Sequence, residues 1–558
     1  MSAPIPKDER GAAARVRLWP LGGLGEVGMN CMAFEQRGDV VVVDCGVTFD
    51  DRGLGVDVIH PSFESLEPLA DRIRGLVLTH GHEDHIGAVA YFLRRFDVPV
   101  YGPKYALALL EEKAAEFEIL EHATFVEVRP REPFEVGSFV VEPIRVTHSI
   151  ADATALAIRT DAGTVIHTGD FKFDDSPPDG EEFDVARFTE LGDEGVALLL
   201  SDSTNVDARG ENASESTVGE ALDRVVGNAR GAVVCALFGS NVHRLRLVAE
   251  TARRTGRRIA LLGRGIETHF RVGHRTGYLD WPADLVLPTT RLDEVPRSTI
   301  LALATGTQAE ANAALARLAR GDHPKFTLVE GDTVVLSSRV IPGRDPEVYA
   351  MMGNLLRRGV ELRSWITDKD VHVSGHAYRS EQRRMLDLVR PTNFVPVHGT
   401  LHHLTRHAEL AAEAGVATRL VLENGDVAEL EGGRIAKVGT VPSGRVHVNV
   451  GRVLSPEVLR ARLALAREGV VAATVVLDGR GYVLDAIVKG VGIFDVGMHD
   501  AHAADVRRTV LDAVGSTTWS GKDDDALMEA SRRAIRRAVV RITGTKPETA
   551  VAVARVNS

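Results

Sequence analysis

Segment 79–87, which reads THGHEDHIG, constrains this chain more than any other feature. It follows the apolar run 76–78 and precedes a predicted helix over 87–95. His80 and His82 lie two apart at a strand end, so both can bind one ion. Asp84 and His85 stand at the turn into the helix, where they can bind a second ion, and imidazole with carboxylate suits Zn²⁺ or Mn²⁺. A surface loop has no structural use for this density of ligands, so the segment predicts a metal centre.

Three further ligand types follow other β-rich segments. His148 comes after the predicted strand 139–147, Asp170 after 164–168, and His398 after 393–397. Any one of them alone is as easily explained as a cap at a strand end. In α/β folds, however, active-site groups collect at the carboxyl ends of strands. Together with segment 79–87, the three residues therefore predict one shared centre.

The rhythm of strands and helices predicts the domain organisation. Up to about residue 215, short β-rich segments alternate with turns and with helices such as 104–118, which is typical of sheets covered by helices. From 216 to 365, strand and helix alternate strictly, which indicates a parallel sheet. Strands predicted at 371–373 and 393–397 return to the first pattern, so the middle region is interpreted as an inserted domain. The predicted division is a disordered tail at 1–14, a split first domain at 15–215 and 366–440, the insert at 216–365, a linker at 441–460, and a C-terminal α+β domain at 461–558.

The C-terminal domain has its own signals. Segments 470–477 and 482–488 flank Asp-Gly-Arg-Gly at 478–481, a hairpin pattern. Helices are predicted over 501–514 and 524–542, and a last strand over 549–555. One face of the second helix is apolar. The opposite face carries five arginines: Arg532, Arg533, Arg536, Arg537 and Arg541. A solvated basic face is one interpretation of this pattern, and a contact with RNA or another subunit is the other.

Composition limits the classes of function. Of the 558 residues, 44% are hydrophobic, which is enough for large cores. No apolar run approaches the ~18 residues of a membrane helix, and the N-terminus lacks the apolar core of a signal peptide. The three cysteines lie far apart in apolar runs, which favours a reducing cytoplasm over a disulfide framework. A net charge of −12 disfavours nucleic-acid binding, so an RNA substrate requires local positive charge from metals or a basic groove.

Several stretches carry a family resemblance. Segment 79–87 combines with LGGLGEVG at 21–28, FGSNVH at 238–243 and VHVSGH at 371–376. Together they are similar to the ribonuclease J family, in the β-CASP branch of the metallo-β-lactamase superfamily, over nearly the whole chain. The resemblance implies an α/β fold: a metallo-β-lactamase αββα core, an inserted βαβ (β-CASP) domain and a small C-terminal α+β domain. The branch motifs correspond to Asp202, His376 and His398, and His at the last motif is associated in the family with RNA substrates.

The resemblance also implies a role for each metal-site residue. His80, His82 and His148 would bind one metal, Asp84, His85 and His398 the other, and Asp170 would bridge them. Two such ions, roughly 3.5–4 Å apart, clamp the attacking and leaving oxygens of a displacement at phosphorus. His376 would bind the scissile phosphate or protonate the leaving 3′ oxygen. Asp202 would orient a metal-binding histidine.

A phosphate-binding pocket and a second cation site are expected from the same source. The segment at Ser240 and Asn241 lies between a strand and a helix start, a geometry that binds anions but also serves as an ordinary cap. The residues implied to bind phosphate and RNA are Ser240, Asn241, Val242, His243, His372, Val373, Ser374, Gly375 and His376. Gly55 and Asp57 resemble a structural Ca²⁺ site, but Asn449 stands where an acid is expected, which weakens that prediction.

The glycines of segment 23–28 formally match a dinucleotide-binding fingerprint. That fingerprint must open a helix, whereas 31–44 has the pattern of strand and turn. Segment 23–28 is therefore predicted to form a tight loop beside the metal site.

The resemblance implies a cytoplasmic two-metal phosphodiesterase that uses Zn²⁺ or Mn²⁺. Its expected activity on single-stranded RNA is 5′-to-3′ exonucleolytic, with a preference for a 5′-monophosphate, and also endonucleolytic, in mRNA decay and rRNA maturation. A homodimer or homotetramer without membrane attachment is expected. A DNA-processing nuclease of the same branch is an alternative, against which His398 argues. A β-lactam or thioester hydrolase would not need the inserted domain, and the complete ligand set disfavours a non-catalytic scaffold.

Overall fold

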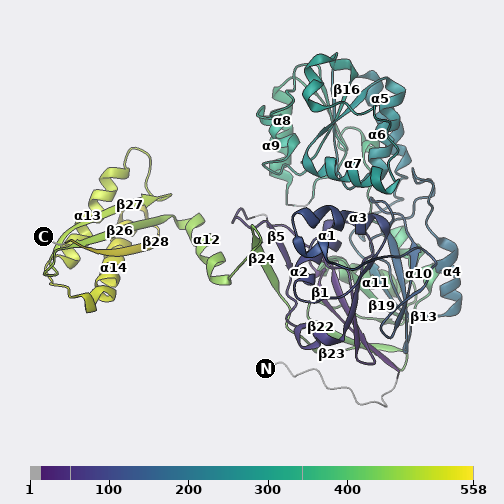
Figure 1. Ribbon diagram of the computed structural model, residues 1–558, viewed down its shortest axis with the longest axis horizontal. Coiled ribbons are helices and arrows are strands. Elements are labelled where there is room, and N and C mark those ends of the chain that lie inside the picture. Colours follow the sequence, from purple (N-terminus) through teal and green to yellow (C-terminus); the bar gives the residue numbers. More distant parts are fainter. Residues whose placement is uncertain (1–13, 51, 342, 557–558) are drawn as a thin grey trace. The chain divides into compact units, whose positions relative to one another are not determined.

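The computed structural model describes residues 14–50, 52–341 and 343–556 (Figure 1). The predicted tail therefore lies outside the described residues, except for Ala14. The chain forms two compact units. The first runs to Arg445 and excludes 49–59, and the second consists of 49–59 with the residues from Val446 on.

Two sheets facing each other form the core of the first unit. The first has the strand order β23-β22-β1-β3-β4-β6-β7-β8. Its strands are β1 (Arg15–Gly22), β3 (Cys31–Gln36), β4 (Asp39–Val43), β6 (Ile73–Val77), β7 (Val100–Gly102), β8 (Phe125–Glu127), β22 (Asp426–Glu431) and β23 (Arg434–Thr440). The second has the order β21-β19-β13-β12-β11-β10-β9. Its strands are β9 (Phe134–Val136), β10 (Phe139–Arg145), β11 (Thr154–Thr160), β12 (Gly163–His167), β13 (Val196–Asp202), β19 (Asn393–Val397) and β21 (Thr418–Arg419).

Alternate apolar side chains of both sheets meet in one buried cluster, in which Leu18, Phe34, Phe139 and Leu200 are fully buried. Burial of this kind contributes about 25 cal/mol per Å² of apolar surface. The helices of this region are α1 (Glu83–Ile86), α2 (Val89–Leu93), α3 (Lys104–Glu112), α4 (Val185–Glu194), α10 (Arg379–Val389) and α11 (Leu401–Glu413). Of these, α4, α10 and α11 were not predicted, and α3 is shorter than the helix predicted over 104–118, because 3₁₀ turns follow it.

A third sheet, between Val233 and Ser364, is parallel throughout, as the strand–helix alternation predicted. Its order is β15-β16-β14-β17-β18, with β14 (Val233–Ala236), β15 (Arg258–Leu262), β16 (Ile300–Ala304), β17 (Thr333–Leu336) and β18 (Glu361–Ser364). Figure 1 shows α5 and α6 on one side of it and α8 and α9 on the other. The helices are α5 (Ser216–Asn228), α6 (Val242–Thr255), α7 (Arg264–Thr276), α8 (Ala314–Arg320) and α9 (Asp345–Arg357), of which α5 and α7 were not predicted.

The second unit contains the predicted C-terminal hairpin. β26 (Val470–Leu477) pairs antiparallel with β27 (Val483–Val491) and parallel with β28 (Glu548–Arg555). The helices α13 (His499–Val514) and α14 (Asp524–Thr543) pack on this sheet through Val506, Val510 and Ile535. Before them come β24 (Arg445–Asn449), β25 (Arg452–Leu454) and α12 (Pro456–Glu468), and the segment 49–59 leads into β5 (Val58–Pro61).

Two predictions about local structure were wrong. The expected linker 441–460 is structured, because β24 and β25 pair and α12 begins within it. The expected strand 371–373 is instead the end of the 3₁₀ turn Lys369–Val371, followed by irregular chain. Its carbonyl groups are instead bound by side chains: Ser337 Oγ donates to Val371 O over 2.6 Å, and Arg244 contacts Val373 O at 3.5 Å. In the described ranges, no helix is long and apolar enough to cross a bilayer.

Candidate metal centre

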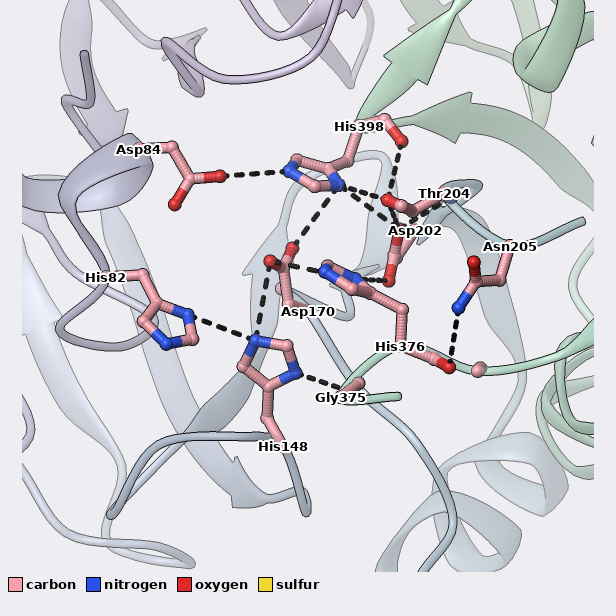
Figure 2. A network of polar contacts seen from close by, with 12 residues as sticks. His82, Asp84, His148, Asp170, Asp202, Thr204, Asn205, Gly375, His376 and His398 are labelled. Atoms are coloured by element: carbon pink, nitrogen blue, oxygen red, sulfur yellow. Dashed lines mark hydrogen bonds and ion pairs between the residues drawn. The ribbon is translucent and has the colours of Figure 1, made fainter. Parts of the chain in front are cut away.

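The strands that precede the predicted ligands end at one edge of the two-sheet core. β4 and β6 are parallel neighbours, and so are β12, β13 and β19. Because carboxyl ends of parallel strands lie at the same edge, the loops after these strands meet. Figure 2 shows the result, with Asp170 between His148, His376 and His398.

Two sets of donors form at this edge and share Asp170. The first contains His80, His82, His148 and Asp170, and the second contains Asp84, His85, Asp170 and His398. Within each set, one ligand atom from every residue lies within 4.8 Å of the others. These are the two sets that the resemblance implied.

The nitrogen atoms of the first set converge on one point. His80 Nε2 and His148 Nε2 each lie 3.1 Å from His82 Nδ1. Asp170 Oδ2 is 3.8 Å from His80 Nε2 and 3.7 Å from His148 Nε2. In the second set, Asp170 Oδ2 lies 3.2 Å from His85 Nε2, and His398 Nε2 lies 3.3 Å from Asp84 Oδ2.

Asp170 tests whether these donors fit metal ions. Its carboxylate is 2% exposed, and its Oδ1 atom has no hydrogen-bond partner among the described residues. A buried carboxylate oxygen without a donor is costly unless positive charge satisfies it. The site therefore fits two cations, and its imidazole and carboxylate donors suit Zn²⁺ or Mn²⁺.

Outer contacts fix how the histidines point. His85 Nδ1 lies 2.7 Å from Asp44 Oδ2, and His398 Nδ1 lies 2.6 Å from Thr204 Oγ1. His148 Nδ1 donates to Gly375 O over 2.6 Å. Each contact uses Nδ1 and turns Nε2 toward the centre, which is how outer partners orient metal-binding imidazoles. Sequence reasoning missed Asp44 and Thr204, because single residues after a strand carry no motif.

Backbone strain marks the same place. Asp44 and His398 have φ values of 59° and 54°, in the left-handed region that residues other than glycine rarely adopt. Such conformations persist at functional sites where the surroundings hold them. Here Asp44 accepts a hydrogen bond from the Thr79 backbone over 2.8 Å, and Gly399, next to His398, donates to Gly23 O over 3.2 Å.

The glycine loop lies beside the centre, as predicted. Leu24 pairs with Gly399, next to His398. Gly23 has a φ of 89°, and a Cβ there would lie 2.4 Å from Asn30 Oδ1. Asn30 Nδ2 is in turn 3.0 Å from His85 Nε2. The loop therefore needs glycine in order to pass close to the donors.

The two donor sets differ in their protonation. Burial lowers the pKa of His82 to about 4, and it lowers the pKa of His80 and His148 well below the ordinary value, with help from neighbouring histidines. These three rings are neutral at neutral pH. For His85 and His398 burial acts in the same direction, but the negative charge of Asp170 and nearby carboxylates outweighs it and raises the pKa of both well above the ordinary value.

His376 is held beside the donors by Asp202. Asp202 Oδ2 lies 2.8 Å from His376 Nδ1, and Oδ1 lies 3.2 Å from His398 Nδ1. Burial lowers the pKa of His376, but the charge of Asp202 outweighs this effect and raises it. Asn205 donates to His376 O over 3.1 Å and fixes the loop. Asp202, His376, His398 and Asp170 also form a third group with metal-ligand geometry.

The predicted phosphate-binding residues are used in several ways. Asn241 caps α6, because its side chain accepts from Arg244 N over 3.0 Å. His372 Nδ1 lies 3.0 Å from Arg244 Nη1, and Ser374 Oγ accepts from Asn205 over 2.8 Å. The other members are buried Val242, His243 and Val373 and half-buried Ser240 and Gly375.

A buried ion pair that the sequence did not reveal joins these segments. Arg244 is 1% exposed and donates to both oxygens of Glu215, over 2.7 and 2.9 Å. It also donates to Ser337 O over 2.7 Å. Glu215 precedes α5, where the chain enters the inserted domain, and His372 lies where the chain leaves it. The pair therefore fixes the return segment that leads to His376.

The predicted Ca²⁺ site at Gly55 and Asp57 has other contacts. Arg462 Nη1 donates to the carbonyls of Leu54 and Gly55, over 2.8 Å each. Asp57 Oδ2 accepts from Val450 N over 2.5 Å. These contacts use the oxygens expected to bind a cation, and a guanidinium already supplies positive charge. Arg462 therefore already supplies positive charge to this segment, and the cation site at Gly55 and Asp57 stays a prediction that these contacts do not favour.

Family models match four segments of the chain. They match as the metallo-β-lactamase superfamily (24–210), the ribonuclease J β-CASP domain (230–355), the Zn-dependent metallo-hydrolase RNA specificity domain (369–421) and the ribonuclease J C-terminal domain (457–556). The expected fold class, a metallo-β-lactamase domain with an inserted β-CASP domain and a C-terminal domain, is confirmed.

Individual proteins agree with this. Ribonuclease J from Synechocystis is 40% identical over 84% of this chain and 74% of its own length. Ribonuclease J from Mycobacterium tuberculosis is 40% identical over 87% of this chain and 88% of its own. A solved structure of a protein of unknown function from Enterococcus faecalis shares the fold alone, with a TM-score of 0.55 and 16% identity over 74% of this chain and 99% of that one. The chain belongs to the ribonuclease J family.

Proposed function

We propose that this protein is a metal-dependent ribonuclease that hydrolyses phosphodiester bonds of single-stranded RNA. The observation that carries the proposal is the pair of donor sets that share Asp170, with His376 held beside them. The matched RNA specificity domain, 369–421, contains both His376 and His398. The similar proteins from Synechocystis and Mycobacterium tuberculosis are ribonucleases, which supports RNA as the substrate.

In the proposed mechanism, His80, His82, His148 and Asp170 would hold one ion, and Asp84, His85, His398 and Asp170 would hold the other. Bound divalent ions supply Lewis-acid activation of water and phosphate. Asp44, Thr204 and Gly375 keep the imidazoles in place while the substrate binds. Asp202 orients both His398 and His376.

His376 is proposed to protonate the leaving group. Its Nδ1 contacts Asp202, which leaves Nε2 as the nitrogen that can donate, and its raised pKa keeps a proton available near neutral pH. A water molecule loses one proton to solvent as its oxygen bonds to phosphorus, the bond from phosphorus to the 3′ oxygen breaks, and the proton of Nε2 passes to that oxygen. Solvent then returns a proton to Nε2. The products carry a 5′-phosphate and a 3′-hydroxyl.

The exonuclease mode is proposed to depend on Ser240 at the start of α6. The start of this 14-residue helix presents the positive end of the helix dipole, which favours an anion. A pocket there would fit a 5′-monophosphate and exclude the longer, more charged triphosphate. We expect Ser240→Leu to weaken 5′-to-3′ degradation of monophosphorylated RNA and to leave internal cleavage largely intact.

Both products should be measured on one transcript that carries either terminus. Equal exonuclease rates on the two termini would refute the pocket, while the metal-dependent mechanism would stand.

One assay separates this function from its alternatives. With Zn²⁺ or Mn²⁺ present, 5′-monophosphorylated RNA, single-stranded DNA and a chromogenic β-lactam are offered side by side. We expect RNA to be cleaved fastest. Faster cleavage of DNA would favour a DNA-processing nuclease, and hydrolysis of the β-lactam alone would favour a small-molecule hydrolase. The proposal includes a cytoplasmic homodimer or homotetramer that acts in mRNA decay and rRNA maturation.

A further inference from the structure

The end of helix α14 borders an open cavity of about 610 Å³ within the C-terminal domain. The helix is charged unevenly, with Asp524, Asp525 and Glu529 in its first half and the arginines after them. The residues that line the cavity are Arg536, Arg537, Val540, Arg541, Lys546, Pro547 and Glu548. Four cations and one carboxylate therefore surround it.

These cations differ from other arginines of the same helix. Arg532 and Arg533 lie 3.7 and 3.9 Å from the carboxylate of Glu529. Among the described residues, no carboxylate forms an ion pair with a cation of the cavity, and Arg541 makes only a 3.4 Å hydrogen bond to Thr509 Oγ1. All four cationic side chains are exposed, so their charge is available to a ligand.

Helix stability does not explain this arrangement. Cations are favoured near a helix C-terminus, but the effect fades beyond the last turn, which accounts for Arg541 and not for Arg536 or Arg537. Arg537 and Arg541 are four apart, where like charges repel. The domain core uses the opposite face, through buried Ile535 and Ala538. Neither packing nor local electrostatics requires the cluster.

We propose that this cavity binds the phosphodiester backbone of single-stranded RNA. Guanidinium groups bind phosphate oxygens in a two-pronged geometry, and Val540, 38% exposed, offers an apolar surface to a ribose or base. In a chain with a net charge of −12, such a cluster supplies local attraction for a polyanion. The choice of RNA as the polyanion rests on the proposed function.

The test measures affinity without cleavage. Full-length protein binds a fluorescein-labelled single-stranded RNA of 20 or so nucleotides in EDTA, and anisotropy is followed from low to high salt. The variant R536Q/R537Q is compared with R532Q/R533Q, which removes the same charge from the same helix. We expect R536Q/R537Q to weaken binding by about tenfold and to flatten the slope of log affinity against log salt by ~1.4, since each lost phosphate contact is worth ~0.7 for single strands. The control pair should change affinity less than about twofold.

Equal weakening by both pairs would reduce the effect to net charge and overturn the proposal. So would unchanged affinity in R536Q/R537Q, or a changed oligomeric state without changed affinity, measured by sedimentation velocity. A circular-dichroism melt of each variant checks folding, and Lys546→Gln, outside the helix, should weaken binding in the same direction. RNA cleavage by the wild type with metal tests the proposed function separately, so the two failures are distinguishable.

Discussion

The two donor sets of the metal centre are alike in composition and opposite in protonation. Both use imidazole and share Asp170, but the first adds a third histidine and the second adds Asp84. Burial keeps His80, His82 and His148 neutral, whereas carboxylates hold protons on His85 and His398. The first set can accept a cation directly. The second must release protons as it does so.

Loss of the shared carboxylate should have the largest effect. Asp170→Asn removes a charged donor from both sets, so both ions should be lost. RNA cleavage should fall by at least ~10⁴-fold, since most of a typical enzymatic acceleration of 10⁶ or more would depend on them. Metal content and initial rates are the measurements, and Asp175→Asn, which alters an exposed acid, is the control. If Asp170→Asn kept both ions, the carboxylate would not bridge.

His376→Ala tests whether there are two sets or three. His376 belongs to the third group, with Asp202, Asp170 and His398, yet we expect it to serve the leaving group. Turnover should then fall about 10²–10⁴-fold, the usual range for a general acid, at unchanged metal content. A variant that lost one ion per chain would make His376 a ligand and break the comparison. The pH–rate profile gives a second readout. The fall in rate at high pH reports the loss of the proton from His376, so this fall should be absent in the variant.

Asp44→Asn should affect the second set and spare the first. Asp44 Oδ2 lies 2.7 Å from His85 Nδ1 and contacts no other histidine of the two sets at such a distance. Loss of an outer partner of this kind typically costs 10–100-fold in metal affinity or activity. We expect metal titration to show this loss of affinity in the weaker binding step, which we assign to the second donor set. A loss shared equally by both steps would mean that Asp44 supports the whole site and not one ligand.

The candidate metal ligands could be predicted from the sequence because they lie in the short segments that follow apolar strands, where their position is set by local pattern. Asp44 stands in the same kind of place but lacks a neighbouring ligand, so nothing distinguished it from a cap. The Arg244–Glu215 pair joins residues 29 apart in the sequence and has no periodic signal. The strand prediction at 371–373 failed for a related reason. Val371 and Val373 suggested a strand, but side chains bind the carbonyl groups of that segment.

The inserted domain and the C-terminal hairpin followed from periodicity, which reports burial. The structure of segment 441–460 could not be predicted in this way. Its Pro and Gly residues mark turns but do not show that the strands between those turns pair. Helices α7, α10 and α11 contain many charged or histidine residues, which obscure their apolar faces. Arg462 could not be linked to Gly55 from the sequence, since 407 positions separate them.

A metal titration of the demetallated protein, with RNA cleavage measured at each step, tests the central claim most directly. At pH 8 we expect two equivalents per chain, with cleavage appearing as the second binds. At pH 6 the first step should be little changed, because the pKa of His82 is about 4. The second should weaken, because His85 and His398, whose pKa values are raised, retain their protons below those values. Full cleavage without metal, or a single equivalent that supports full activity, would contradict the account.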